Sequence, residues 1–193
     1  GEDSSPGRRP LHDLTLQNRS GLPDEMRCLL AERPRESWAD PVLPETARFW
    51  LQMHDGFRRQ TAVMRQLTTE GALAPRSVHP RLIQTLNGFL GHLDGHHRVE
   101  SGHYFPAFRR AEPRIVEGLD LLDRDHDVIH GHLEALHGAG AAFHQAVTSG
   151  AGGFAELGRL NDVLSEAGPS LSRHLDDEEE IVIPLLALHG DHG

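Results

Sequence analysis

Histidine and carboxylate side chains recur four residues apart at three places in this sequence. The three pairs are His96 and Glu100, His126 and His130, and His174 and Glu178. Because a helix turns once every ~3.6 residues, each pair would project from one helix face, one turn apart. Imidazole nitrogens and carboxylate oxygens suit iron, manganese and zinc. The spacing therefore predicts a metal site, with His54 on an earlier apolar stripe as a further ligand.

Two of these segments repeat one another. HHRVESGHYFP at 96–106 and HLDDEEEIVIP at 174–184 place His, Glu and Pro at the same relative positions, 78 residues apart. His54-Asp55 and His126-Asp127 share a second dipeptide. The pattern indicates a two-helix unit used twice around a pseudo-two-fold axis. That symmetry suits two metal ions, because each half can supply most of one ion's ligands.

Four long stretches have apolar residues at helical spacing, at about 44–70, 80–111, 113–150 and 154–188. Pro and Gly residues punctuate them, Pro169 predicts a kink or break in the last stretch, and no strand-like alternation is evident. We predict an all-α, up-down-up-down four-helix bundle over residues 44–190. Residues 1–43 form an N-terminal extension, in which 1–20 are expected to be disordered and 22–32 to make a short helix.

The same ligand-type residues could also have purely structural roles. A single His on an apolar face is usually a core residue, His-x-x-x-His recurs by chance in a chain with 15 His, and the run 176–180 could be a solvated acidic face. However, four helices each place such residues in mid-stripe. Two carboxylates buried there without partners would cost several kcal/mol, and a bound cation removes that cost.

Composition excludes several classes of protein. The chain has 193 residues, enough for one domain, and its 19 cationic residues are all Arg, which excludes a Schiff-base or phosphate-loop lysine. The single Cys28 excludes an internal disulfide and a cysteine-caged metal. A net charge of −10 argues against nucleic acid as a partner. Neither a secretory signal nor a membrane-spanning stretch is evident, so we expect a cytoplasmic protein.

The ligand pattern resembles the hemerythrin family, specifically the bacterial HHE cation-binding domains, over about residues 44–188. The segment RFWLQMHDGFRR at 48–59 and the Asp125-His126 dipeptide share the likeness. The resemblance implies two iron ions in an oxo- or hydroxo-bridged non-haem centre, with zinc and manganese as the alternatives. One iron would be held by His126, His130 and His174. The other would be held by His54 and His96 and left open for dioxygen, and Glu100 and Glu178 would bridge the two.

Several neighbours of these ligands have open roles. Glu179 is the alternative to Glu178, because oxygen carriers of the family have their carboxylate one residue further along. His103 and Tyr104 lie close enough on the same helix to coordinate metal or to support a ligand. His97 has no acid four residues later, so we expect it at the boundary of the core, with His96 as the ligand.

The resemblance implies binding of dioxygen or a related small ligand, such as peroxide or nitric oxide. A di-iron oxidase, oxygenase or peroxidase acting on a small substrate is the first alternative. A zinc-binding or metal-free helical module is the second. Whether the protein is an enzyme, which redox partner it uses and its oligomeric state stay open.

Overall fold

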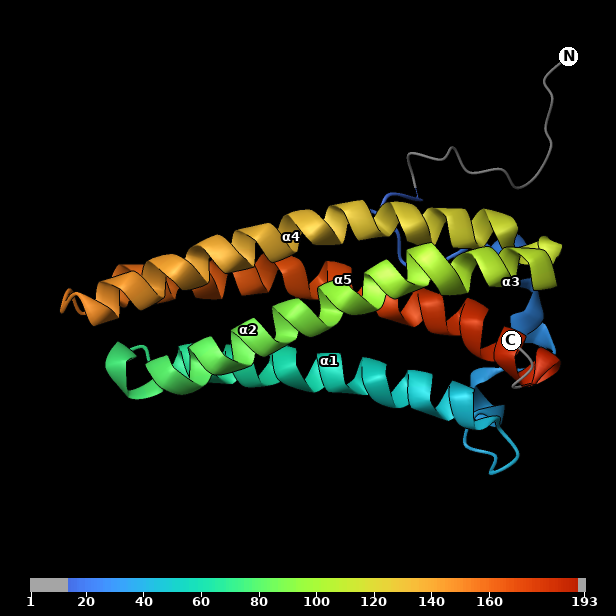
Figure 1. Cartoon of the computed structure of the whole chain (residues 1–193), viewed down its shortest axis with the longest axis horizontal. Coiled ribbons are helices and arrows are strands. Elements are labelled where there is room, and N and C mark those ends of the chain that lie inside the picture. Colours follow the sequence, from blue (N-terminus) through green and yellow to red (C-terminus); the bar gives the residue numbers. More distant parts are fainter. Residues whose placement is uncertain (1–13, 191–193) are drawn as a thin grey trace, which may run out of the picture.

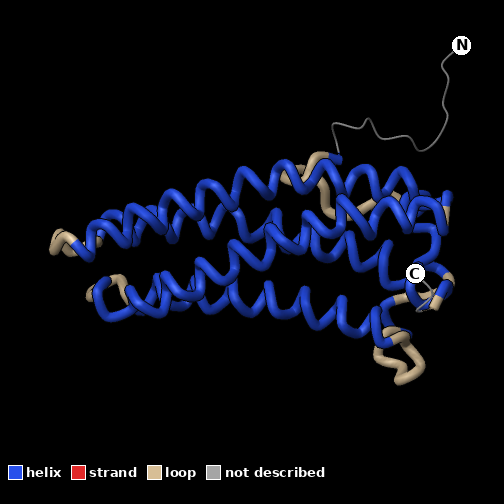
Figure 2. The backbone as a smooth tube through the Cα atoms, viewed as in Figure 1, coloured by secondary structure: helices blue, strands red, loops and turns tan. Residues whose placement is uncertain are grey.

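The computed structural model describes residues 14–190, and every regular element in that range is helical (Figures 1 and 2). The all-α prediction is therefore confirmed. The four long helices are α1 (Glu45–Glu70), α2 (Pro75–Val99), α4 (Val116–Thr148) and α5 (Phe154–His189). The short elements are the 3-10 helices η2 (Asp24–Ala31), η3 (Arg35–Ser37) and η5 (Pro113–Ile115), the π-helical turn η4 (Glu100–Tyr104), and α3 (Phe105–Ala111).

The four long helices lie side by side along the long axis of the molecule (Figure 1). Helix α1 packs on α2 and α5, and α4 packs on the same two helices. The turns 71–74 and 149–153 lie at one end of the molecule, and the segment from Glu100 to Ile115 lies at the other. Each long helix can therefore present one face to a common interior.

Local sequence accounts for most helix ends. Helix α1 stops at Gly71, whose N–H donates to the Leu67 carbonyl at 2.9 Å. The turn before α5 uses Gly150, Gly152 and Gly153, all with φ between 82° and 86°, a conformation that only glycine adopts without strain. Helix α2 begins at Pro75, earlier than predicted. Helix α5 runs through Pro169 without a break, where a kink or break was predicted.

The apolar core has two parts, with a polar layer between them. One cluster, including Phe57, fills the half of the bundle that ends in the two turns, and the other, including Trp50, fills the opposite half. On α1 the buried His54 lies between these two aromatic residues. The polar layer is therefore enclosed by hydrocarbon on both sides, where electrostatic interactions are stronger than in water.

The N-terminal extension is more ordered than predicted. The short helix expected at 22–32 is present as η2. Residues 14–20, expected to be disordered, pack against the bundle, and Leu14, Leu16 and Arg19 are buried. Residues 1–13 lie outside the described part of the chain. Among residues 14–190, no helix has the length and apolar character needed to cross a membrane.

Candidate metal centre

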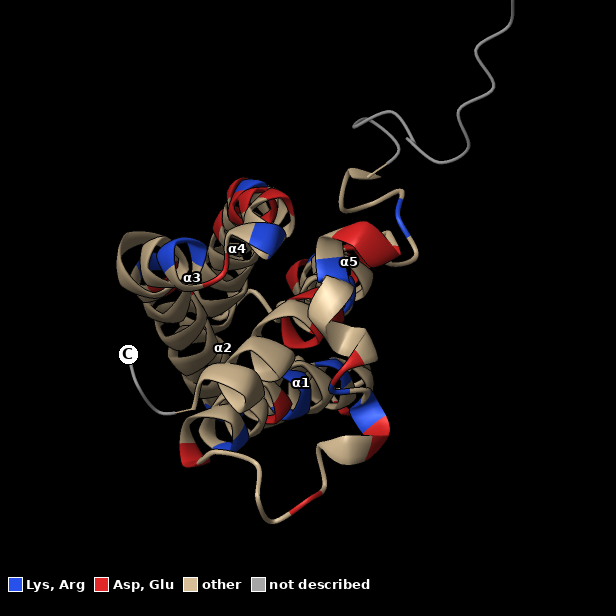
Figure 3. Ribbon diagram, turned by 90° about the vertical axis from the view of Figure 1, so that its right-hand side faces the viewer, with Lys and Arg blue, Asp and Glu red and all other residues tan. Residues whose placement is uncertain are grey.

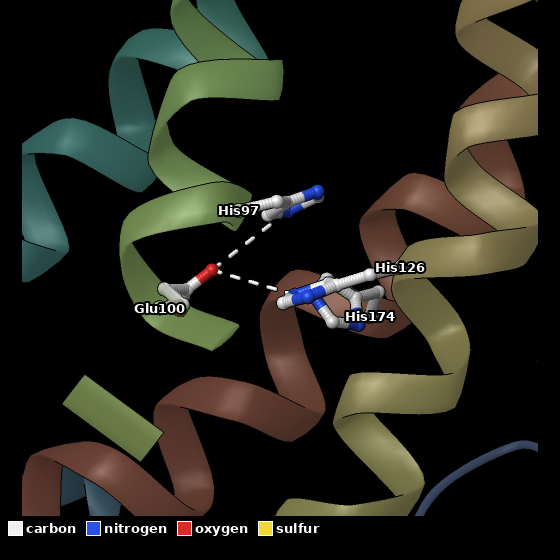
Figure 4. Close-up of side chains that lie close together, drawn as sticks. All are labelled: His97, Glu100, His126 and His174. Atoms are coloured by element: carbon white, nitrogen blue, oxygen red, sulfur yellow. Dashed lines mark ion pairs between the residues drawn. The ribbon is translucent and has the colours of Figure 1, made fainter. Parts of the chain in front are cut away.

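Seven buried or nearly buried ligand-type side chains form two adjoining clusters. In each, one ligand atom from every residue lies within 4.8 Å of the others. The first cluster is His97, Glu100, His126 and His174, and the second is His54, His96 and Glu178. They come from α1, α2 with its π-turn, α4 and α5. All four long helices therefore contribute to one site, and Figure 4 shows the first of its two clusters.

Both carboxylates face both clusters. Glu100 Oε1 lies 3.3 Å from His96 Nε2 and 3.5 Å from His126 Nε2. Figure 4 shows the same oxygen directed toward His97 and His126. Glu178 Oε2 lies 2.7 Å from His54 Nε2, while its Oε1 lies 3.6 Å from His174 Nε2. Each carboxylate is thus placed where it could bridge two metal ions.

The atoms that point into this space lack hydrogen-bond partners. They are the Nε2 atoms of all five clustered histidines, both oxygens of Glu100 and Oε1 of Glu178. An unsatisfied buried polar group costs about 1–3 kcal/mol, so eight in one place need a common explanation. A pair of cations would satisfy all of them. The donor set, nitrogen and carboxylate oxygen without sulfur, fits iron, manganese or zinc.

The pKa values of these groups are shifted by burial and by the charges that face one another across the site. Burial and the neighbouring Glu178 raise the pKa of Glu100 well above its usual range. Burial, together with nearby imidazoles, lowers the pKa of His97 well below its usual value and that of His126 to about 4. Burial opposes the charging of His54, but Glu178 and Glu179 raise its pKa to about 9. His97 and His126 are therefore neutral at pH 7, the form that binds metal.

Acceptors behind the rings fix the orientation of three histidines. Each ring has its Nδ1 atom 2.8 Å from an oxygen: His54 from Glu179 Oε2, His174 from Asp125 Oδ2, and His126 from Ser101 Oγ. Ser101 donates its hydroxyl proton to Asp123, so its oxygen accepts from His126. An N–H on Nδ1 leaves Nε2 facing the clusters, where its lone pair is available once the ring is neutral. Metal-binding histidines are held in this way by their surroundings.

The acidic run at 176–180 is not a solvated face. Asp177, Glu178 and Glu179 are at most 3% exposed. Arg58 pairs with Glu179 at 2.7 Å, and Arg35 from the N-terminal extension pairs with Glu180 at 3.0 Å. Figure 3 shows acidic and basic residues close together around α5 and α1. Arginine thus offsets the carboxylates that do not face the ligand clusters.

A family model describes this part of the chain. The model of the hemerythrin HHE cation-binding domain matches residues 46–190. The chain belongs to the hemerythrin family. Comparison with curated proteins finds no match, and comparison with solved structures finds none either. Both ligand clusters lie within the matched hemerythrin domain, whereas residues 14–43 lie outside it.

The hemerythrin domain brings together six of the seven residues predicted from spacing. His130 is the exception, because its side chain is 58% exposed and faces Glu134 at 3.1 Å. The buried stripe of α4 passes through Asp125 and Ile129, which leaves His130 on the flank of the helix. Of the residues with open roles, Glu179 lies behind His54. His103 and Tyr104 are both exposed and lie outside the two clusters.

His97 takes the place in the clusters that spacing gave to His130. Consecutive residues on a helix diverge by about 100°, so His96 and His97 can face different clusters. Glu100 follows His97 by three residues and faces both rings. It also begins the π-helical turn, a feature common at functional sites. The His96-His97 pair is the sequence signal for a second ring facing the site, and which of His97 and His130 binds metal stays a prediction.

A pocket reaches the centre from the groove between α2 and α4. Its volume is about 220 Å³, and His97, Ser101 and His126 are among the residues that line it. His130, Asp94, Arg98 and Leu133 complete its wall. On the other side, His54 is fully buried and its ring lies near those of Trp50 and Phe57. This described opening adjoins the His97 cluster, whereas the resemblance implied an open position at His54 and His96.

Proposed function

We propose that this hemerythrin domain holds two iron ions in the two clusters and binds dioxygen or a related small ligand there. The observation that carries the proposal is the position of Glu100 and Glu178, each of which faces both clusters, with both oxygens of Glu100 and Oε1 of Glu178 lacking a hydrogen-bond partner. We interpret the four long helices as the up-down-up-down bundle of the family, which the path in Figure 1 supports. Bound iron would supply reversible electron transfer to the small ligand.

The donor set leaves a net positive charge at the site when two divalent ions are bound. Five neutral imidazoles and two carboxylates give less negative charge than a carboxylate-rich site. Two divalent ions would bring four positive charges, of which Glu100 and Glu178 offset two. The remaining positive charge in a layer enclosed by hydrocarbon favours anionic small ligands.

The pocket indicates which cluster receives the ligand. It opens on His97 and His126, so we assign the small ligand to the first cluster. Pockets for organic molecules of drug size usually exceed about 300 Å³. At about 220 Å³, this pocket suits a diatomic molecule, peroxide or a small anion. The rings of Trp50 and Phe57 pack against those of His54 and His96 in the second cluster.

The residues behind the ligands would keep the site rigid as a ligand enters and leaves. Asp125 and Glu179 hold the rings of His174 and His54 in the orientation that directs Nε2 inward. Trp50 donates its indole N–H to Glu178 Oε2 at 3.1 Å, which orients that carboxylate. Groups held in this way need little reorganisation when charge at the centre changes.

Metal analysis and visible spectroscopy of the purified full chain test the proposal. We expect about two irons per chain, a charge-transfer absorption that shifts when azide is added, and reversible bleaching when oxygen is removed and restored. Zinc at full occupancy, or fewer than two metal ions per chain after anaerobic loading, would contradict the proposal. Catalytic turnover of an organic substrate would favour the oxidase alternative over reversible binding.

A further inference from the structure

The N-terminal extension docks closely on the domain although the family match does not include it. Its segment from Leu14 to Leu43 buries seven apolar side chains against the bundle: Leu14, Leu16, Leu22, Met26, Leu29, Trp38 and Leu43. On α4, a Cβ added to Gly118 would lie 2.6 Å from the Met26 carbonyl oxygen. Only glycine therefore allows this approach of the extension to α4.

Arg19 carries the extension's charge into the protein interior. Its side chain is 1% exposed, and both terminal nitrogens donate to Asp125, with Nη1 lying 2.8 Å from Oδ1. Its Nε donates to Asp177 Oδ2 at 2.8 Å. One guanidinium thus joins α4 and α5, in the two-pronged geometry that arginine forms with carboxylates.

Asp125 links this arginine to a ligand of the first cluster. Its Oδ2 accepts from His174 Nδ1 at 2.8 Å, and the opposite ring nitrogen faces the cluster. Burial alone would raise the pKa of Asp125, but His174 and Arg19 together hold it below its usual value. A carboxylate held in this state fixes the tautomer and the orientation of the ring.

The second cluster has an equivalent support that does not need Arg19. Glu179 holds His54, and Arg58 of α1, within the family domain, pairs with Glu179 at 2.7 Å. The two clusters therefore differ in where their closest outer arginine comes from. Arg58 of the domain lies nearest to Glu179, with Arg35 of the extension farther away at 3.6 Å, whereas Asp125 takes its arginine from the extension.

We propose that Arg19 is a positioning residue for the metal centre, so that the docked extension completes the first cluster through Asp125 and His174. The inference rests on the proposed metal-binding function and adds to it that the domain depends on a segment outside its family boundary. Loss of Arg19 should weaken the binding of the ion in the first cluster and leave the binding of the ion in the second cluster unchanged.

The test loads the full chain with ferrous iron under nitrogen and follows iron loss to a ferrous chelator. For Arg19→Gln we expect one of the two irons to leave faster than from the wild type, by up to about 10- to 100-fold, which is the loss in metal affinity that follows removal of a group bonded directly to a ligand. The other iron should leave at the wild-type rate. Arg19→Lys keeps the charge but loses the two-pronged geometry, so its effect should be intermediate.

Arg27→Gln is the matched control. Arg27 also lies in the extension and pairs with Glu180 of α5, but neither residue belongs to the two ligand clusters. This variant should release both irons at wild-type rates. If iron loss is accelerated equally in Arg19→Gln and Arg27→Gln, the effect comes from docking of the extension alone. That result would overturn the assignment of Arg19 as a positioning residue. Thermal unfolding of the metal-free variants measures their structural effects separately.

The outcomes separate this inference from the proposed function. A wild-type chain that holds two irons, beside an Arg19→Gln chain that loses both at wild-type rates, contradicts the inference alone. A wild-type chain that binds no iron contradicts the proposed function and this inference with it. If Arg19→Gln does not fold, Arg19→Lys decides, and wild-type iron loss from that variant overturns the inference.

Discussion

Replacing Glu100 with Gln should stabilise the metal-free protein while it impairs metal binding. Glu100 is fully buried, and neither of its oxygens has a hydrogen-bond partner. Leaving a buried polar group unsatisfied costs about 1–3 kcal/mol. The glutamine amide can donate to the unpaired acceptors around it, and it avoids the further cost of a buried charge next to Glu178. We therefore expect a gain of about 1–3 kcal/mol at pH 7–8. For a domain of this size that raises Tm by roughly 2–12 °C.

The raised pKa of Glu100 determines how the stability difference between wild type and variant changes with pH. Burial and Glu178 raise the folded-state pKa of Glu100 well above the usual value of about 4.5. A raised carboxyl pKa contributes stability that is complete below about pH 4.5 and is lost as pH rises through the folded-state value. The wild type should therefore lose this contribution as pH rises from about 4.5 through the raised folded-state pKa of Glu100, whereas Glu100→Gln should not. The advantage of the variant grows with pH.

Thermal unfolding of chelator-treated wild type and variant, at pH 5 and pH 8, measures the effect. Glu134→Gln makes the same chemical change at a side chain on α4 that is 72% exposed, and it should leave Tm unchanged. Metal content after anaerobic loading should fall in Glu100→Gln alone. A metal-free Glu100→Gln protein that is less stable than the wild type at pH 8 would refute the reasoning, because it would mean that Glu100 has a favourable environment without metal.

Three further predictions concern the ligands and the docked extension. His97→Ala should lose metal from one cluster while His130→Ala retains two ions per chain, as measured by elemental analysis, and the reverse result would restore the spacing-based assignment. Metal uptake at pH 7 should release protons, because His54, with a pKa of about 9, must free its Nε2 atom. Calorimetry in buffers of different ionisation enthalpy tests this, and buffer-independent heats would contradict it. Gly118→Ala should displace the extension at Met26, increase its proteolysis and lower Tm by a few degrees; unchanged proteolysis would count against close docking.

Spacing along the sequence predicted most of the site because helices convert it directly into geometry. His174 and Glu178 lie one turn apart, so any helix through them places both side chains on one face. The apolar residues on either side fixed which face is buried. The same reasoning applied to α4 predicted that His130 faces the interior beside His126, but its side chain is 58% exposed.

The difference arises where two helices meet. How far a flanking side chain is covered depends on the partner helix, and on α4 the buried stripe runs through Asp125 and Ile129. His97 has the opposite outcome, because α2 lies close enough to α4 for its ring to stack on His126 with centroids 4.0 Å apart. Neither outcome is encoded in the spacing within one helix.

The sequence by itself determined the helical class, the ligand types and the helices that carry them, since these depend on local periodicity and side-chain chemistry. Only the tertiary structure decided which histidines belong to the two clusters and which of the two clusters borders the pocket. It also brought Arg19 to Asp125, 106 residues away in the sequence. Such contacts join segments that are remote in the chain. They are set by packing geometry and by the need to pair buried charges, and no local pattern encodes either.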